Sequence, residues 1–151
     1  LRTREARAMK AARFTLDTTV HQCCMDITPC LSEWLDSIGA SDGMAFIRTF
    51  HTTTSIFMNE HEAGFLTDLQ AKLSELAPEN ASYIHDDFSQ RTNVDADERV
   101  NGYAHIQASL LGSQVAVPVR NGKLDLGTWQ SIIFAEFDGP RRQRTIECTL
   151  I

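Results

Sequence analysis

Residues 121–140 read NGKLDLGTWQSIIFAEFDGP, a strand-rich stretch that begins and ends in turn sequences. An Asn121-Gly122 pair opens it and an Asp138-Gly139-Pro140 run closes it, and both are typical of tight turns between antiparallel strands. We therefore predict that the final third of the chain is a series of hairpins. The strands expected there are Lys123–Leu126, Thr128–Phe137 and Gln143–Leu150.

Upstream of the hairpins, apolar side chains recur at helical spacing in three places. Thr28 followed by Pro29 is a start signal for the first helix, and Gly39 supplies a left-handed stop. The helices predicted from this pattern are Thr28–Ile38, Leu66–Leu76 and Ala104–Leu111.

Extended segments alternate with these helices, and two of them are separated by a break at His51, where a sheet can turn a ligand toward a cleft. The polar, acidic stretch Tyr83–Arg99 is expected to be a long loop, and loops of this length are often functional. Because helices and strands are intermixed without a β-α-β repeat, we predict an α+β fold with a largely antiparallel sheet. The extended segments are Arg13–Thr18, His21–Ile27, Met44–Phe50, Thr53–Met58 and Val115–Val119.

Size and charge limit the classes of protein. The chain has 151 residues, 42% of them hydrophobic, which fits a single domain with a real core. Residues 1–13 carry a net charge of +4 and are expected to form a flexible basic tail, with one domain at 14–151. The whole chain carries −6, so the domain carries −10. That charge disfavours nucleic-acid binding.

The four cysteines, Cys23, Cys24, Cys30 and Cys148, have no CxxC or zinc-knuckle spacing. A nucleophilic pair with His21 is the less favoured alternative to burial of these thiols. No stretch approaches the roughly 18 apolar residues of a membrane-spanning helix, and no signal peptide is evident. We therefore expect a cytoplasmic protein without a membrane partner.

Three histidines lie in polar, turn-flanked motifs: His51 in HTTTS, His85 in YIHDD and His105 in NGYAH. Three imidazoles brought together from separate segments make an open divalent-metal site, with room for water or a phosphate-bearing ligand. Each histidine also has an ordinary alternative, as a residue bonded to nearby threonines, on an acidic loop surface or at a helix start. Asp86, beside His85, could fix the tautomer of a metal-bound ring.

The longest predicted strand begins unusually, with Gly-Thr-Trp-Gln at residues 127–130. Core packing is one interpretation for Trp129, and a pocket for an anion or a ring, lined by Thr128 and Gln130, is the other. On a regular strand Gln130 and Glu136 share a side, so we expect them to line the same cleft.

The chain contains no P-loop, dinucleotide-binding or serine-hydrolase motif. From about Phe14 onward, its ordered series of motifs resembles the YjbQ family of small conserved proteins. The motifs that carry the resemblance are His51-Thr52-Thr53-Thr54-Ser55, Asn59-Glu60, Tyr83-Ile84-His85-Asp86, Asn101-Gly102-Tyr103-Ala104-His105, Ser109-Leu110-Leu111-Gly112, residues 122–130 and residues 136–141.

The resemblance implies an α+β fold with a mostly antiparallel β-sandwich core, about three helices and a homotrimer. It also implies a metal at His51, His85 and His105, and activity as a secondary thiamine-phosphate synthase, which joins hydroxymethylpyrimidine diphosphate to thiazole phosphate and releases pyrophosphate. Imidazole ligands favour zinc, and magnesium is the alternative because it more often assists diphosphate departure. The chain departs from the family pattern at His61 and Tyr103.

Two hypotheses follow. The first is a metal-associated enzyme that acts on a phosphorylated small molecule. The second is a non-catalytic trimer that binds a metal or a small ligand through the same histidines. For the enzyme, the candidate catalytic residues are Asp86, Glu60, Gln130 and Glu136, and the candidate cofactor-binding residues are Thr53 and Thr128.

The strand Thr128–Phe137 also predicts assembly, because it is apolar on both faces. Trp129, Ile133 and Ala135 lie on one face, and Ile132 and Phe134 lie on the other. Both faces must be covered. Three modest helices can hardly cover everything, so we predict burial against symmetry mates in a cyclic trimer, with the metal cleft near a subunit boundary.

Overall fold

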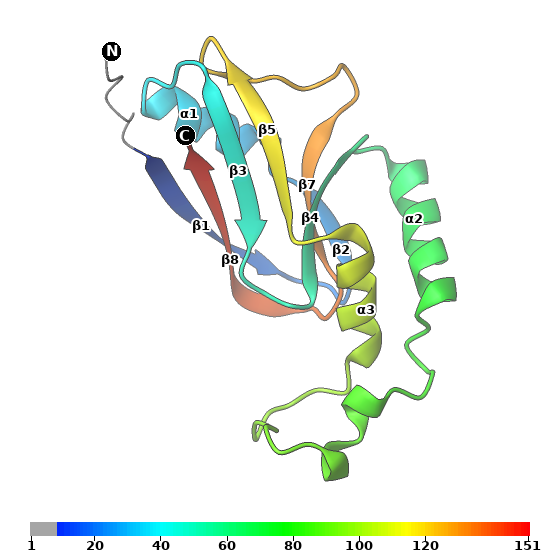
Figure 1. Cartoon of the computed structure of the whole chain (residues 1–151). Coiled ribbons are helices and arrows are strands. Elements are labelled where there is room, and N and C mark those ends of the chain that lie inside the picture. The colour runs from blue at the N-terminus through cyan, green and yellow to red at the C-terminus, as the bar shows by residue number, and fades with distance from the viewer. Residues whose placement is uncertain (1–8) are drawn as a thin grey trace, which may run out of the picture.

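The computed structural model describes residues 9–151, which form an α+β fold with two antiparallel sheets (Figure 1). The predicted fold class is confirmed. Residues 1–8, and with them most of the predicted basic tail, lie outside the described residues. The strands are β1 (Lys10–Thr18), β2 (Cys23–Asp26), β3 (Gly43–Thr49), β4 (Thr54–Asn59), β5 (Gln114–Arg120), β6 (Lys123–Leu124), β7 (Ser131–Glu136) and β8 (Arg141–Leu150). The helices are α1 (Thr28–Ser37), α2 (Ala63–Leu76) and α3 (Gly102–Leu111).

The larger sheet has the strand order β1-β8-β3-β5-β6, and the smaller has the order β2-β7-β4. The predicted series of hairpins is therefore correct only for β5 and β6, because β7 and β8 lie in different sheets and pair with other strands. Consecutive strands β3 and β4 belong to different sheets. The break predicted at His51 is therefore the point at which the chain crosses from one sheet to the other. A residue at such a crossing lies beside the ends of both sheets, which is where a cleft can open.

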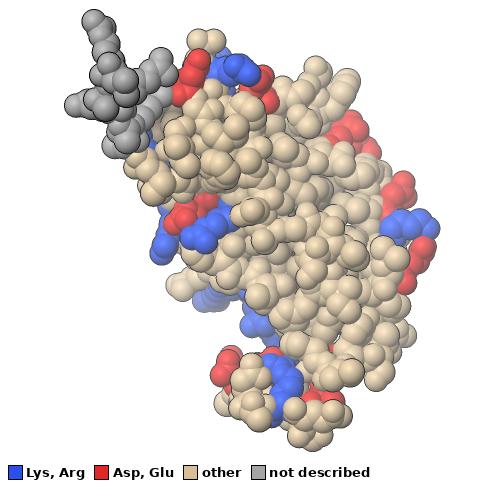
Figure 2. Space-filling model, in the orientation of Figure 1, with Lys and Arg blue, Asp and Glu red and all other residues tan. Residues whose placement is uncertain are grey.

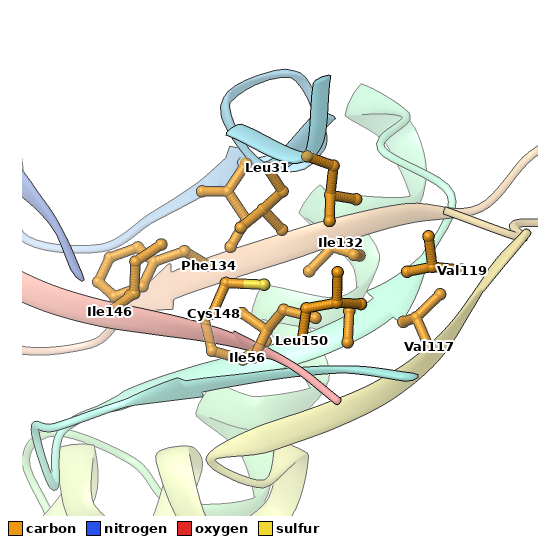
Figure 3. Close-up of a cluster of buried hydrophobic side chains, with 13 residues drawn as sticks. Leu31, Ile56, Val117, Val119, Ile132, Phe134, Ile146, Cys148 and Leu150 are labelled. Atoms are coloured by element: carbon orange, nitrogen blue, oxygen red, sulfur yellow. The ribbon is translucent and has the colours of Figure 1, made fainter. Parts of the chain in front are cut away.

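The main core lies between the two sheets, and α1 packs against it (Figure 3). Ile132 and Phe134 of β7 meet Ile146 of β8 and Leu31 of α1 there, and all four are fully buried. Burying a side chain of this kind contributes about 1.5–3 kcal/mol. This core joins the two sheets into one unit.

A second core lies between the smaller sheet and the helices α2 and α3. Ile133 and Ala135 of β7 pack there with Leu73 of α2 and Ala108 of α3. Alternate side chains of β7 thus enter two separate cores of the same chain, and its four apolar residues are 0% exposed. The expectation that this strand needs a symmetry mate to cover it is therefore wrong.

The helices begin and end close to the predicted positions. Pro29 lies in the first turn of α1, and Gly39 follows the helix with a left-handed φ of +56°. Thr28 does not cap the helix as predicted, because its hydroxyl accepts a hydrogen bond from the Ile132 N–H at 2.8 Å. The helix is instead tied to β7. Glu62 caps α2 by accepting two N–H groups of its first turn.

The predicted strands differ in extent from those observed, and β2 is shorter and β8 two residues longer than expected. β1 begins at Lys10 and pairs with β8, so the predicted boundary between tail and domain falls inside a strand. β7 begins at Ser131 rather than Thr128, because the Gln130 N–H donates to the Gly127 carbonyl at 3.0 Å and closes a turn before the strand. β6 has only two residues, Lys123 and Leu124.

The segment between α2 and α3 is a long loop, as predicted, with two short 3-10 turns, η1 (Ile84–Asp86) and η2 (Phe88–Gln90). In Figure 1 it extends beyond the sheets and returns to the first residues of α3. Within residues 9–151, no helix has the length and apolar character needed to cross a membrane.

Candidate functional site

A cleft of about 360 Å³ lies where the crossing at His51, the first turn of α3 and the start of β8 meet. We call it the histidine–arginine cleft. Its volume is in the range of small-molecule sites. The positively charged and polar side chains that line it include His51, His105, Arg99, Arg141, Arg144 and Thr53.

The main chain of β8 holds His51 on the wall of this cleft. The Thr145 N–H donates a hydrogen bond to Nε2 of His51 at 2.8 Å. The ring therefore takes the place that a carbonyl oxygen would have in a continued strand ladder. Burial and the nearby Arg144 guanidinium lower the pKa of His51, so the ring is neutral near pH 7.

His85 and His105 lie against one another, with ring centroids 4.5 Å apart. Nδ1 of His85 is 3.1 Å from Oδ1 of Asp86, an arrangement in which a carboxylate orients a ring that binds a metal through its other nitrogen. Burial and the neighbouring His85 ring lower the pKa of His105. Two of the three predicted metal ligands, His85 and His105, thus lie together, and Asp86 is in hydrogen-bond distance of the His85 ring.

The third histidine does not close on the same point. His51 shares the cleft with His105, but among residues 9–151 no three histidine, cysteine or acidic side chains lie close enough together to hold a metal ion. The three-histidine metal site stays a prediction, and the pair of His85 and His105 is the part that this geometry supports.

Arg144 is held at the cleft by the buried carboxylate of Glu136. Its guanidinium donates two hydrogen bonds to that carboxylate, at 2.5 and 2.7 Å, and another to the Thr53 hydroxyl at 3.1 Å. Glu136 is 0% exposed and also accepts the Asp138 N–H at 2.9 Å. This geometry makes Glu136 a residue that positions Arg144, with Thr53 in the same network.

Asp138 anchors the other arginines. Its carboxylate accepts hydrogen bonds from Arg141 at 2.5 Å, from Asn101 at 2.9 Å and from Arg99 at 3.4 Å. Burial opposes ionisation, but the hydrogen bonds from Arg141 and Asn101 outweigh it and lower the pKa of Asp138. The carboxylate therefore stays charged and orients two guanidinium groups beside the cleft.

Arg141 and Arg144 are not predicted as a pair from the sequence, because residues three apart on a regular strand face opposite sides. The pairing register of β1 with β8 shifts between Leu16 and Thr18, and Gln143 adopts a left-handed φ of +57°. This bulge turns the strand so that both arginines line the cleft. The only sequence signal is that Arg141 ends one of the motifs that carry the family resemblance.

The cleft also has acidic groups from the long loop, namely Asp95, Asp97 and Glu98. Arg91 forms an ion pair with Glu98 at 3.0 Å, whereas Asp95 and Asp97 are exposed to solvent. Carboxylate oxygens of this kind suit magnesium. The cleft therefore carries negative as well as positive side chains, although these carboxylates do not form a ready-made metal site in the described chain.

Three other candidate residues lie away from this cleft. Glu60 and Gln130 line a separate hollow of about 390 Å³ with Trp129, whose side chain is 74% exposed and not packed in a core. Thr128 lies in the turn before β7. The prediction that Gln130 and Glu136 line one cleft is wrong, because Gln130 belongs to that turn and Glu136 ends the strand.

The residues at which the chain departs from the family pattern lie outside the cleft. His61 is exposed, and its Nε2 lies 3.4 Å from the Cys24 carbonyl oxygen. Tyr103 is buried, and its hydroxyl lies 3.0 Å from Nε2 of His21.

Burial raises the pKa of the Cys23 thiol, and it raises the pKa of the Cys24 thiol to about 11. The alternative of a cysteine–histidine nucleophile is therefore not supported.

Comparison with known proteins places the chain in one family. The family model described as UPF0047 protein YjbQ-like matches residues 12–151. A UPF0047 protein of Archaeoglobus fulgidus is 42% identical over 132 residues, covering 87% of this chain and 94% of its own. The UPF0047 protein YugU of Bacillus subtilis is 35% identical over 127 residues, covering 83% of this chain and 88% of its own.

Solved structures agree with these matches. A YbjQ-like protein of unknown function from Sulfolobus solfataricus has a TM-score of 0.84 at 31% identity, covering 95% of this chain and 96% of its own. An uncharacterized conserved protein of the yjbq/upf0047 family from Clostridium acetobutylicum has a TM-score of 0.80 at 36% identity, covering 93% and 99%.

Proposed function

The chain belongs to the YjbQ-like family of UPF0047 proteins, and from the geometry of the histidine–arginine cleft we propose that it binds a phosphorylated small molecule there. The observation that carries the proposal is the convergence of Arg141, Arg144 and two histidine rings on one cleft. Guanidinium groups suit phosphate because their N–H groups form paired, charge-assisted hydrogen bonds.

The arginines are oriented before a ligand arrives. Glu136 holds Nε and Nη2 of Arg144, and Asp138 holds Nε and Nη2 of Arg141. In the described part of the chain, Nη1 of each guanidinium makes no hydrogen bond, so each keeps donors for a ligand. Side chains fixed in advance lose little conformational entropy on binding, which favours affinity.

The reaction implied by the resemblance makes use of these groups. In thiamine-phosphate formation, the thiazole nitrogen bonds to the methylene carbon of hydroxymethylpyrimidine diphosphate, and the carbon–oxygen bond breaks so that pyrophosphate departs with the electron pair. Negative charge grows on the departing oxygen, and donors that bind it more tightly in the transition state accelerate the step. We assign this role to Arg141 and Arg144.

The residues present fit a divalent metal in part. His85 and His105 offer two nitrogens, and Oδ1 of Asn101 is a buried oxygen with no hydrogen-bond partner in the described chain. Asn101 lies one helical turn before His105, and its amide is oriented by donation to Asp138. A divalent ion, when bound, would help to neutralise the diphosphate.

The enzyme hypothesis is tested by supplying purified protein with zinc or magnesium and the two substrates, and measuring thiamine phosphate. We expect product well above that of a His51→Ala variant. Arg141→Gln should lower kcat/KM by about 10- to 100-fold, because it removes a charge-assisted contact to the leaving group. Arg142→Gln, an exposed neighbour on β8, is the matched control and should behave as wild type. Product no higher than that of His51→Ala would contradict the assignment.

The second candidate is a non-catalytic protein that binds a metal or small ligand, and the His85–His105 pair with Asp86 favours it. It predicts metal affinity that is lost in His105→Asn, without product under any metal supply. Turnover in the assay above would exclude it.

A further inference from the structure

We propose that His51 is a fixed hydrogen-bond donor, through Nδ1–H, to an anion in the histidine–arginine cleft, and that it is not a metal ligand. This inference rests on the proposed function for the identity of its ligand. It rests on the geometry of His51 alone for the exclusion from the metal site.

The tautomer follows from one hydrogen bond. A main-chain N–H can only donate, so the bond from Thr145 to Nε2 of His51 uses the lone pair of that nitrogen. A neutral imidazole carries a single proton, which must then be on Nδ1. Thr145 belongs to β8 and is paired with β1, so the donor is part of a sheet and cannot turn away. The ring is held in one tautomer by the fold.

This tautomer is unsuited to a metal. A metal binds an imidazole nitrogen that has a free lone pair, and in His51 one nitrogen is occupied by Thr145 and the other carries the proton. To become a ligand, the ring would have to release the Thr145 N–H, and an unpaired amide in a partly buried position costs about 1–3 kcal/mol. His85 differs, because its bond to Asp86 leaves Nε2 free.

The same tautomer suits a phosphate oxygen. His51 lines the cleft together with Arg141, Arg144 and Thr53, so its N–H adds a neutral donor to a set of cationic ones. The nearby Arg144 guanidinium and burial lower the pKa of His51, so the ring stays neutral and keeps this single donor at physiological pH. Arg144 and Arg141 act on the ring against the carboxylate of Glu136, which is itself paired with Arg144. Asp95, Asp97 and Glu98 line the same cleft, and the donors at the ring are the groups that suit an anion.

The exclusion from the metal site is tested by nitrogen NMR of the imidazole rings in the full chain, with each ring assigned from a His→Asn variant. We expect the ligand-free protein to show His51 protonated on Nδ1 and unprotonated on Nε2. Titration with zinc should shift the ring nitrogens of His85 and His105 and leave those of His51 unchanged. A proton on Nε2 of His51, or a zinc-dependent shift of its ring together with the other two, would overturn the proposal.

The donor role is tested with two substitutions and inorganic pyrophosphate as the probe. In His51→Asn, the amide nitrogen lies near the former Nδ1 and restores a donor, so affinity should stay within about threefold of wild type. His51→Leu removes the donor and should weaken binding about tenfold or more. Equal losses in both variants would refute the donor role. If wild-type protein binds no pyrophosphate, the proposed function and the donor role both fail, whereas the zinc titration still decides whether His51 is a metal ligand.

Discussion

At the scale of single residues, the buried ion pair of Glu136 and Arg144 contributes both to folding stability and to the histidine–arginine cleft. Glu136 is fully buried, and Arg144 has a side chain only 9% exposed, so each charge depends on the other. Removing one partner of such a pair leaves an uncompensated charge in the interior. The residue that orients the cleft arginine is therefore also one on which the fold depends.

Glu136→Ala should lower the free energy of unfolding by about 3–5 kcal/mol, because it strands the Arg144 charge. Glu147→Ala is the matched control on β8, where the carboxylate pairs with Arg13 and Arg48, two arginines that are mostly exposed. That change should cost less than about 1 kcal/mol. Urea unfolding at neutral pH measures both, and similar losses for the two variants would contradict the account of the buried pair.

Acid should destabilise the protein through His51 and His105. Burial lowers the pKa of both rings below the ordinary value, so on acidification the unfolded chain takes up protons before the folded chain does. Their contribution to stability is thus complete above about pH 6.5 and declines as the pH falls toward the lowered values. The urea midpoint should fall between about pH 7.5 and 5.5 in wild type. The fall should be smaller in a double variant that carries His51→Gln and His105→Gln. An equal or larger difference in the double variant would oppose this.

The histidines could be picked out from sequence because each stands in a polar motif beside a turn. Arg141 and Arg144 could not, because their common orientation depends on a bulge at Gln143 that no alternation pattern predicts. Nor could the Thr145 bond to His51 be foreseen, since it joins residues 94 positions apart.

At the scale of elements, the long loop and α3 form one unit through Asp86. Its Oδ1 accepts the N–H groups of Asn101 and Gly102, at 3.1 and 2.9 Å, at the start of the helix. A side chain from the loop thus caps a helix whose own N-cap residue makes no such bond. The same carboxylate orients His85, so loop placement and ring placement are coupled.

Asp86→Ala should destabilise the protein by about 0.5–2 kcal/mol, as expected for the loss of a cap, and should speed hydrogen exchange at the Asn101 and Gly102 amides. Asp86→Asn keeps an acceptor oxygen and should retain most of the protection. Unchanged exchange in the alanine variant would show that this carboxylate is not the cap.

Elements with strong local patterns were predictable, and those set by a few hydrogen bonds were not. The helical periodicity of α2 and the turn at Asn121 and Gly122, both with positive φ, follow from local sequence. The start of β7 does not, because Thr128, Trp129 and Gln130 have side chains that a strand accepts, and only the turn at Gly127 removes them from it.

At the scale of the whole molecule, one face is suited to contact with other copies. Figure 2 shows a broad stretch with few charged groups over β3, β5 and α3. Phe46 on β3 is 43% exposed, and α3 exposes Ile106 and Leu110. Uncharged surface with exposed apolar side chains often marks a protein–protein contact. This face, rather than β7, is the physical basis on which we expect the trimer that the family resemblance implies.

Light scattering coupled to gel filtration should therefore give about three times the 16.9 kDa chain mass at micromolar concentration. Phe46→Glu, which places a charge on the apolar face, should shift the protein toward monomer without unfolding it. Thr15→Glu on β1 adds the same charge at an exposed position of the sheet and is the control. A wild-type monomer would contradict the assembly.

Calorimetric titration with inorganic pyrophosphate tests whether the histidine–arginine cleft binds a phosphorylated ligand. We predict one site per chain, with binding weakened about tenfold or more in Arg141→Gln and unchanged in Arg142→Gln. No binding by wild-type protein, or the same weakening in both variants, would contradict it.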